Sequence, residues 1–188
     1  MRRLLPLLLV AALTAACAGK TVENGAVSPS LKGVGGLAAG VFPIGDRELA
    51  PVLRGTTLDG ESFDVGSLRG KVVVLNFWAS WCAPCRAEAR NLNEVYAKTK
   101  PLGVEFVGID IKDDRVAAQA FVRNKAVRYP SLFDQSGLLL LKFRGQAPQS
   151  PPTTLVLDRE GRVAARFLQP VTTTQLLVPV QVIAAERA

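Results

Sequence analysis

The stretch that decides the fold covers residues 72–90 and reads VVVLNFWASWCAPCRAEAR. It begins with a continuous apolar block rich in β-branched side chains, which is typical of a buried strand. After Pro84 the pattern becomes amphipathic and helix-like, and proline is well tolerated in the first turn of a helix. Cys82 and Cys85 therefore stand where a buried strand passes into a helix.

This position predicts the chemistry of the two cysteines. Free amides and the macrodipole at a helix N-terminus favour an anion, so a thiolate is stabilised there. Two cysteines at this spacing can close a disulfide. We predict Cys82 to be the more exposed, attacking thiol and Cys85, one turn further on, to be the resolving thiol. A structural disulfide and a Cu(I) site formed by the same two thiolates are the alternatives.

The composition excludes several other classes of site. The chain has 188 residues, three cysteines, no histidine and a formal net charge of +7. Without histidine there is no Ser-His or Cys-His hydrolase mechanism and no imidazole metal ligand, and three cysteines cannot form a four-cysteine zinc site. The positive charges form no long run, so we expect no nucleic-acid partner. We also expect no metal and no cofactor.

The N-terminus has the pattern of a targeting segment. Residues 1–16 combine Arg2 and Arg3 with an apolar core and small residues, which predicts a signal peptide. The apolar core is too short to span a bilayer, which needs about 20 residues. Residues 13–17, LTAAC, resemble a bacterial lipobox, and this implies cleavage before Cys17 and attachment of lipid to its sulfur. A plain secretory signal is the alternative.

The segment after the leader shows no clear hydrophobic period. Residues 17–46 are rich in Gly, Ala, Ser and Val, and we interpret them as a flexible, lipid-anchored tether. An extra edge strand near residues 36–42 is the alternative. The globular domain is then expected to cover residues 47–188.

Within that domain, strand and helix patterns alternate. Asp59-Gly60 favours a tight hairpin between strands at residues 52–57 and 61–65. Further elements are expected as follows: strands at 72–77, 104–110, 153–157 and 162–167, helices at 83–98 and 115–125, a short helical turn at 138–143, and a last helix capped by Thr172 or Thr173 that Pro179 ends or kinks. This order predicts an α/β fold with a mixed sheet covered on both faces.

Two motifs carry a family resemblance. Residues 77–86, FWASWCAPCR, resemble the active site of the thioredoxin superfamily, and Pro152-Thr153-Thr154 resembles its cis-proline segment. The LRGK run at residues 68–71, the NFWASWC run and the lipobox resemble the membrane-anchored TlpA/ResA branch. The resemblance covers residues 47–188 and implies a thioredoxin-like mixed β-sheet sandwiched by helices, with an N-terminal β-hairpin.

The resemblance also implies a substrate-binding surface. It places Trp81 on the contact surface, with Trp78 in the wall behind it, and it gives Pro84 a part in setting the redox potential. Pro152 becomes the cis-proline that faces the two cysteines. The residue before the cis-proline usually pairs with the substrate through both N–H and C=O, but Pro151 has no N–H and keeps only its carbonyl.

A proton acceptor is expected outside the central strand. Asn76 stands where the superfamily often has a buried carboxylate, and it cannot titrate. The TlpA/ResA branch supplies a carboxylate after the next strand, which favours Asp113 here, with Asp110 as the other candidate. A helix N-cap is an equally acceptable role for Asp113. Three charged residues of the first long helix are expected to face solvent: Arg86, Glu88 and Arg90.

The predicted function is that of an extracytoplasmic, membrane-tethered thiol–disulfide oxidoreductase. Disulfides persist outside the cytoplasm, so a reductant there must be recharged, which implies an electron-donor protein in the membrane. The resemblance suggests that the substrates are disulfides of secreted proteins or apocytochrome c. The alternatives are a net disulfide oxidant and a Cu(I) or cytochrome-assembly metallochaperone. A thiol peroxidase would need Thr before its reactive cysteine, where Ser80-Trp81 stands.

Overall fold

The central strand, β4 (Val72–Trp78), is buried at every position. The computed structural model describes residues 39–143 and 150–186. β4 pairs in parallel with β5 (Val104–Ile111) and antiparallel with β7 (Thr153–Leu157). With a strand on each side and helices on each face, β4 has no position that meets water, which explains its continuous apolar sequence.

The main sheet has six strands in the order β1-β8-β7-β4-β5-β6. β1 (Ala39–Val41), β8 (Val163–Phe167) and β7 form the antiparallel side, whereas β4, β5 and β6 (Ser131–Asp134) are parallel. The sheet is therefore mixed, as predicted. Strands β2 (Arg54–Thr56) and β3 (Ser62–Asp64) form the predicted hairpin.

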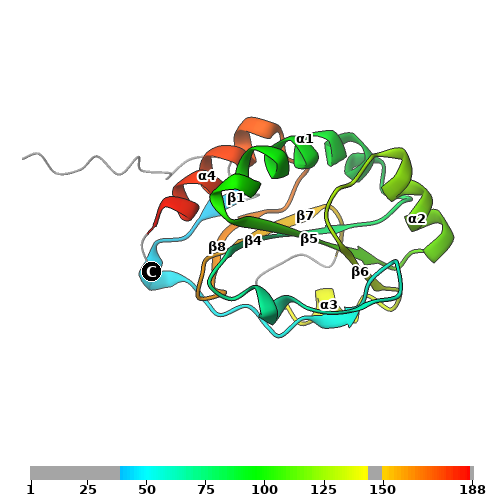
Figure 1. The fold of residues 1–188 in the computed structure, drawn as a ribbon, viewed down its shortest axis with the longest axis horizontal. Coiled ribbons are helices and arrows are strands. Elements are labelled where there is room, and N and C mark those ends of the chain that lie inside the picture. The colour runs from blue at the N-terminus through cyan, green and yellow to red at the C-terminus, as the bar shows by residue number, and fades with distance from the viewer. Residues whose placement is uncertain (1–38, 144–149, 187–188) are drawn as a thin grey trace, which may run out of the picture. The chain divides into compact units, whose positions relative to one another are not determined.

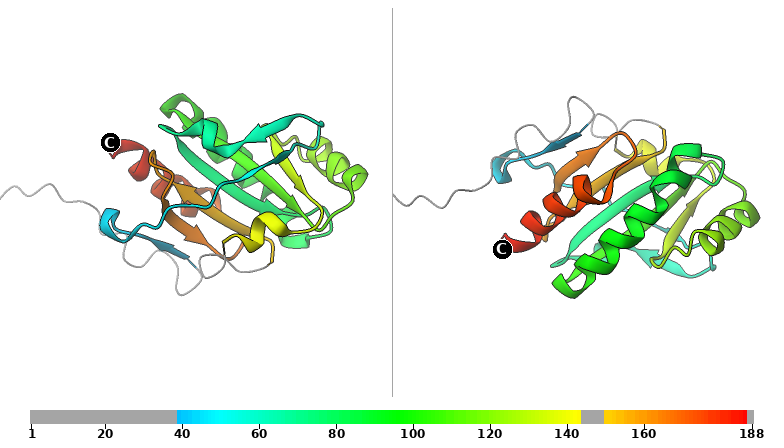
Figure 2. Two further views of the ribbon diagram at one scale, coloured as in Figure 1. Left: turned by 90° about the horizontal axis from the view of Figure 1, so that it is seen from below. Right: turned by 90° about the horizontal axis from the view of Figure 1, so that it is seen from above.

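The two faces of the sheet carry different elements. Helices α1 (Ala83–Thr99) and α4 (Thr173–Ala185) lie side by side over one face, with α2 (Arg115–Asn124) beyond α1, as Figure 1 and the right-hand view of Figure 2 show. The opposite face carries the short helix α3 (Leu138–Leu141) and the β2–β3 hairpin. The predicted α/β sandwich with an N-terminal hairpin is confirmed. Within the described ranges, no helix is long and apolar enough to cross a membrane.

Alternate residues of β4 enter two separate cores. Val73, Leu75 and Phe77 pack with α3 and with residues next to the hairpin. Val72 and Val74 instead pack with apolar residues of α1 and α4. Successive side chains of a strand point to opposite faces, so one apolar strand supplies both layers.

The N-terminal boundary predicted at residue 46 is wrong. β1 lies inside the segment interpreted as a tether, and it pairs with β8 from Ala39 opposite Phe167 to Val41 opposite Ala165. This agrees with the alternative of an edge strand near residues 36–42. A three-residue strand is too short to show a period, and its pairing with β8 supplies the backbone hydrogen bonds that place it. The signal peptide, Cys17 and the rest of the tether lie outside the described residues.

Of the two effects expected of Pro179, that it ends or kinks the last helix, the first is wrong, because α4 continues to Ala185. Thr172 caps the helix in a capping box with Gln175. A proline inside a helix removes one backbone hydrogen bond. Here Leu176, Val180 and Ile183 are buried against α1 and the sheet on both sides of the proline. This tertiary packing keeps the helix continuous, because packing of an apolar face supplies most of a helix's stability.

A buried ion network joins three distant segments at the end of the sheet opposite the cysteines. The Arg47 side chain is 3% exposed and contacts both carboxylate oxygens of Glu186, at 2.6 and 2.7 Å, and one oxygen of Asp158, at 3.2 Å. The hydrogen bond with Glu186 raises the pKa of Arg47, and Asp158 adds to this effect, although burial opposes it. The network therefore ties the segment after β1 to the β7–β8 turn and to the end of α4.

We expect Arg47→Ala to lower the free energy of unfolding by about 3 kcal/mol, because it leaves the buried Asp158 carboxylate without its cation. Urea denaturation at pH 7 measures the effect. Arg54→Ala is the matched control, since Arg54 pairs with Asp64 on the exposed hairpin. The control should hardly move the unfolding midpoint. Equal effects of the two substitutions would contradict the prediction.

Candidate active site

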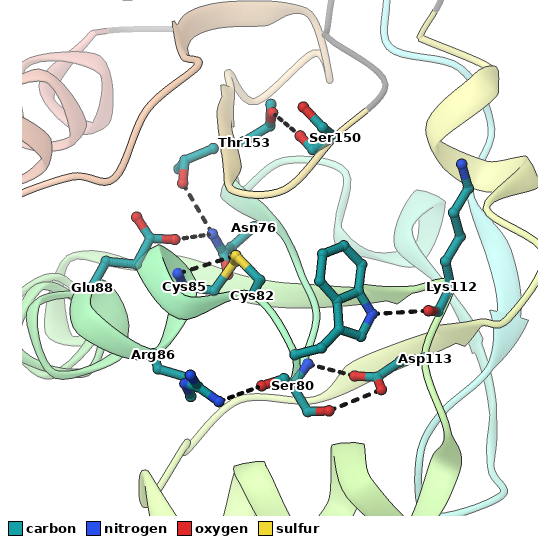
Figure 3. Close-up of a disulfide and its surroundings, with 12 residues drawn as sticks. Asn76, Ser80, Cys82, Cys85, Arg86, Glu88, Lys112, Asp113, Ser150 and Thr153 are labelled. Carbon is teal, nitrogen blue, oxygen red and sulfur yellow. Dashed lines mark hydrogen bonds between the residues drawn. A yellow bond between two sulfur atoms is a disulfide. The ribbon is translucent and has the colours of Figure 1, made fainter.

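Cys82 and Cys85 form a disulfide at the start of α1, with their Cα atoms 5.3 Å apart. Cys82 is the N-cap residue, and its Sγ accepts a hydrogen bond from the backbone N–H of Cys85 at 3.2 Å (Figure 3). Cys82 is 4% exposed and Cys85 is 2% exposed, so Cys82 is the more exposed of the two, although both residues are buried in this oxidised form. Leu58, Trp78 and Phe121 belong to the cluster that surrounds them.

The loop between β4 and α1 is held by the loop between β5 and α2. The Asp113 carboxylate accepts hydrogen bonds from the Ser80 backbone N–H and, at 2.9 Å, from the Ser80 hydroxyl. The Trp81 indole N–H donates to the backbone carbonyl of Lys112 at 2.9 Å. Lys112 has a φ of 51°, an uncommon conformation for a residue other than glycine. The residues directly before Cys82 are therefore fixed by two side chains.

The hydrogen bonds of the Asp113 carboxylate join it to Ser80 and to the backbone of its own loop. Its residue is 8% exposed, and its Oδ1 also accepts the N–H of Asp114 at 2.8 Å. Asp114, not Asp113, is the N-cap of α2, where it accepts the N–H of Ala117 at 3.0 Å. The N-cap alternative for Asp113 is thus excluded. A carboxylate with three donors is suited to hold the loop in place.

Glu88 is buried, so the prediction that it faces solvent is wrong. It is 1% exposed and lies one helical turn after Cys85, on the same face of α1. The Asn76 amide donates to its Oε1 at 3.1 Å, and the Val171 backbone N–H donates to its Oε2 at 2.9 Å. Asn76 also donates to the Thr154 hydroxyl at 3.2 Å. Figure 3 shows Glu88 and Asn76 beside the disulfide.

The environment of Glu88 gives it a titration near neutral pH. Burial raises its pKa to about 7, although the hydrogen bonds from Val171 and Asn76 act in the opposite direction. It therefore exchanges a proton in the range where thiol chemistry proceeds. One signal in the sequence could have revealed the burial of Glu88. It is spaced one helical turn from Cys85, and Ala89 and Leu92 on the same face of the helix are apolar.

Asp110 is a further buried carboxyl group near the site. It is 0% exposed and pairs with Trp78 in the register between β4 and β5. Burial raises its pKa to about 8, and the charge of Asp113 adds to the shift. The sequence analysis thus named both aspartates, which lie beside Trp78 and Ser80, but it missed the buried Glu88.

The substrate-binding residues predicted from the resemblance lie at the carboxyl end of β4. The Pro151–Pro152 bond is cis, as predicted. Thr153 pairs with Phe77, so Pro152 lies where β4 ends, and Figure 3 shows the segment from Ser150 to Thr153 beside the disulfide. Trp81 is 56% exposed. Pro84, in the first turn of α1, is exposed as well.

Sequence comparisons agree with this site. A model of the Redoxin family matches residues 42–182. The thiol-disulfide oxidoreductase ResA of Bacillus thuringiensis (strain Al Hakam) is 34% identical over 127 residues, which cover 68% of this chain and 72% of that protein. The thiol-disulfide oxidoreductase ResA of Bacillus subtilis (strain 168) is 31% identical over 126 residues, which cover 66% of this chain and 68% of that protein.

Solved structures show the same similarity. A secreted thiol-disulfide isomerase from Corynebacterium glutamicum superposes with a TM-score of 0.76 at 31% identity, covering 80% of this chain and 94% of that chain. A DsbF homologue from Corynebacterium diphtheriae has a TM-score of 0.73 at 35% identity, covering 78% of this chain and 94% of that chain.

Glu88→Gln should change how stability depends on pH. The folded state holds the Glu88 proton up to about pH 7, whereas the unfolded chain releases it near 4.5. Ionising Glu88 therefore costs stability as pH rises between these values. In the Gln variant this part of the decline should be absent, which urea denaturation at several pH values between 4 and 8 measures. Glu94→Gln, an exposed change on the same helix, should keep the decline, and a Glu88→Gln variant that also kept it would contradict the prediction.

Proposed function

The chain belongs to the Redoxin family as a thiol–disulfide oxidoreductase of the TlpA/ResA type, and from this premise we propose that it reduces protein disulfides outside the cytoplasm. The observation that carries the direction is the buried Glu88 beside the cysteine pair. Once ionised, its negative charge disfavours a thiolate at the pair and so weakens the reduced state. A less stable dithiol gives up its electrons more readily, which makes the pair more reducing.

In the first step, the reduced Cys82 sulfur attacks a substrate disulfide. A bond forms between Cys82 and one substrate sulfur, the substrate S–S bond breaks, and the second substrate sulfur leaves as a thiolate. The N–H of Cys85 and the start of α1 stabilise the attacking Cys82 thiolate. Asp113 contributes by holding Ser80, two residues before the nucleophile.

In the second step, Cys85 resolves the mixed disulfide. Its thiol loses a proton, attacks the Cys82 sulfur and releases the remaining substrate sulfur as a thiol. Two electrons have then passed from the enzyme dithiol to the substrate, and the disulfide between Cys82 and Cys85 is restored. We assign the proton acceptor as Glu88, because it is one helical turn from Cys85 and titrates near neutral pH.

The substrate is proposed to lie across the exposed Trp81 and Pro84 and against the Pro151–Pro152 segment. Trp81 provides an apolar surface with a fixed orientation, because Lys112 holds its indole. Pro151 offers a carbonyl group but no N–H to an extended substrate. Substrate backbone pairing at this residue is therefore limited to a hydrogen bond in which the substrate is the donor.

The proposed location is the outer side of the cell membrane, with lipid on Cys17 as the anchor. The extracytoplasmic location agrees with the secreted nature of the isomerase from C. glutamicum. An electron-donor protein of the membrane would reduce the pair after each turnover. Disulfides of secreted proteins, including apocytochrome c, are the proposed substrates.

Net oxidation is the second candidate, and one contact favours it. The hydrogen bond from Cys85 N–H to Cys82 Sγ stabilises a thiolate in the reduced state, and strong oxidants of this kind owe their potential to a stabilised reduced form. The N-cap contact and the Glu88 charge therefore act in opposite directions on the same equilibrium. The reduction potential decides between them.

Cys85→Ser should trap a mixed disulfide between Cys82 and a substrate, because the resolving sulfur is missing. Non-reducing electrophoresis with a disulfide-containing peptide measures the adduct, which should disappear on reduction. Cys82→Ser should form no adduct and should lack disulfide-reductase activity. If the two variants exchanged these behaviours, the assignment of nucleophile and resolving cysteine would be wrong.

Redox titration against glutathione or dithiothreitol at pH 7 tests the direction of electron flow. A reductant should show a potential near that of thioredoxin, about −270 mV, whereas a value near about −120 mV would identify a strong oxidant. Glu88→Gln should raise the potential at pH 8, because it removes a negative charge beside the pair. Glu94→Gln is the control on the exposed face of α1 and should leave the potential unchanged.

A further inference from the structure

Asp110 is a fully buried acid at the carboxyl end of β5. Its residue is 0% exposed, and among the described residues no donor reaches either carboxyl oxygen. An ionised carboxylate in such a place is costly, because it has lost water and gained no donor. It lies on β5 beside Trp78, and Trp78 is the last residue of β4 before the loop that leads to Cys82.

The group that Asp110 faces is a second carboxyl group, that of Asp113. Burial is the main cause that raises the pKa of Asp110, and Asp113 adds to it through its charge and as the hydrogen-bond acceptor available to a protonated Asp110. Two carboxyl groups in contact cannot both ionise without strong repulsion, so such a pair holds one proton at neutral pH. Within the described part of the chain, three donors face Asp113 and none faces Asp110, which favours Asp110 as the holder of the proton.

The charged groups around Asp110 do not stabilise its ionised form enough to remove this proton at neutral pH. Arg115 of α2 lowers the pKa of Asp110, but its guanidinium is directed to the carbonyls of Thr57 and Leu58, at 3.0 and 2.8 Å. Asp134 at the end of β6 raises the pKa of Asp110, and its own carboxylate accepts the backbone N–H groups of Leu138 and Leu139 in α3. The net effect of burial and charge is a pKa of about 8 for Asp110.

We propose that Asp110 is a positioning residue, which carries a proton at neutral pH and donates it to Asp113, so that Asp113 keeps its hydrogen bonds to Ser80. Figure 3 shows Asp113 directed at Ser80, on the loop that Trp81 and Cys82 continue. When Asp110 ionises, a second negative charge appears beside Asp113. The two carboxylates then repel each other and the contact with Ser80 weakens. The loop before the nucleophile thus becomes less ordered at alkaline pH.

The test is an NMR titration of the full-length, oxidised protein in detergent, labelled with ¹⁵N and with ¹³C at the aspartate carboxyl groups. Between pH 5 and 10, the Asp110 carboxyl signal and the Ser80 amide signal should shift together, with a midpoint near pH 8. Asp110→Asn is isosteric and donates to Asp113 at every pH, so its Ser80 amide should stay at the neutral-pH position. Asp114→Asn changes the exposed neighbour and keeps a good N-cap, so it should titrate like the wild type.

A functional arm uses the reduced protein. The alkylation rate of Cys82 with iodoacetamide should show an inflection near pH 8, in addition to that of the thiol itself, and Asp110→Asn should lack it. Two results with the wild-type protein would overturn the proposal, even if the Asn variant failed to fold. One is an Asp110 carboxyl group that titrates below pH 6, and the other is a Ser80 amide signal that does not shift as Asp110 titrates. The proposal rests on the proposed function only for the role of Cys82. The NMR arm contains no substrate, so it succeeds or fails independently of the reductase assays.

Discussion

The hydrogen bond from the Cys85 N–H to the Cys82 sulfur is the interaction on which the site depends. It makes a sulfur atom the N-cap of α1, so the first turn of the helix and the redox pair are one structure. A group in this position meets unpaired amides and the positive end of the helix macrodipole, and both favour a thiolate. The buried strand β4 ends at Trp78, four residues before this N-cap sulfur, so the core of the sheet leads directly into the redox pair.

Three buried carboxyl groups, those of Glu88, Asp110 and Asp113, lie on or beside the elements that carry the cysteine pair, and they differ in their hydrogen-bond donors. Asp113 has donors for both of its oxygens, Glu88 has one donor for each, and Asp110 has none among the described residues. Burial alone would push every one of them towards the neutral form. The number of donors differs accordingly: Asp113 has enough of them to hold the Ser80 loop, burial raises the pKa of Glu88 to about 7, and burial raises the pKa of Asp110, which has none, to about 8.

Local patterns in the sequence predicted most of the fold and the two cysteines. The apolar run of β4, the proline in the first turn of α1 and the Asp-Gly turn each determine structure over a few residues. Glu88 was missed because a charged residue is ordinarily exposed, and its burial depends on donors from Asn76 and Val171, which are distant in sequence. β1 was assigned to the tether for a similar reason, since its position depends on pairing with β8. Helix α4 passes Pro179 because of packing that no local window contains.

Contacts between residues that are far apart in the sequence also make the β2–β3 hairpin part of the site, although the hairpin carries none of the reacting groups. Leu58, in the hairpin turn, packs in the cluster around the disulfide, and its N–H donates to the Ser131 carbonyl at 2.9 Å. Its own carbonyl accepts hydrogen bonds from Arg115 and Gln119 of α2. The turn thus connects β6 to α2 beside Trp78 and the cysteines. An apolar side chain here excludes water from the disulfide, and the exclusion of water is also what raises the pKa of the neighbouring carboxyl groups. The hairpin therefore influences the electrostatics of the site, since removing its apolar side chain would admit water beside the disulfide.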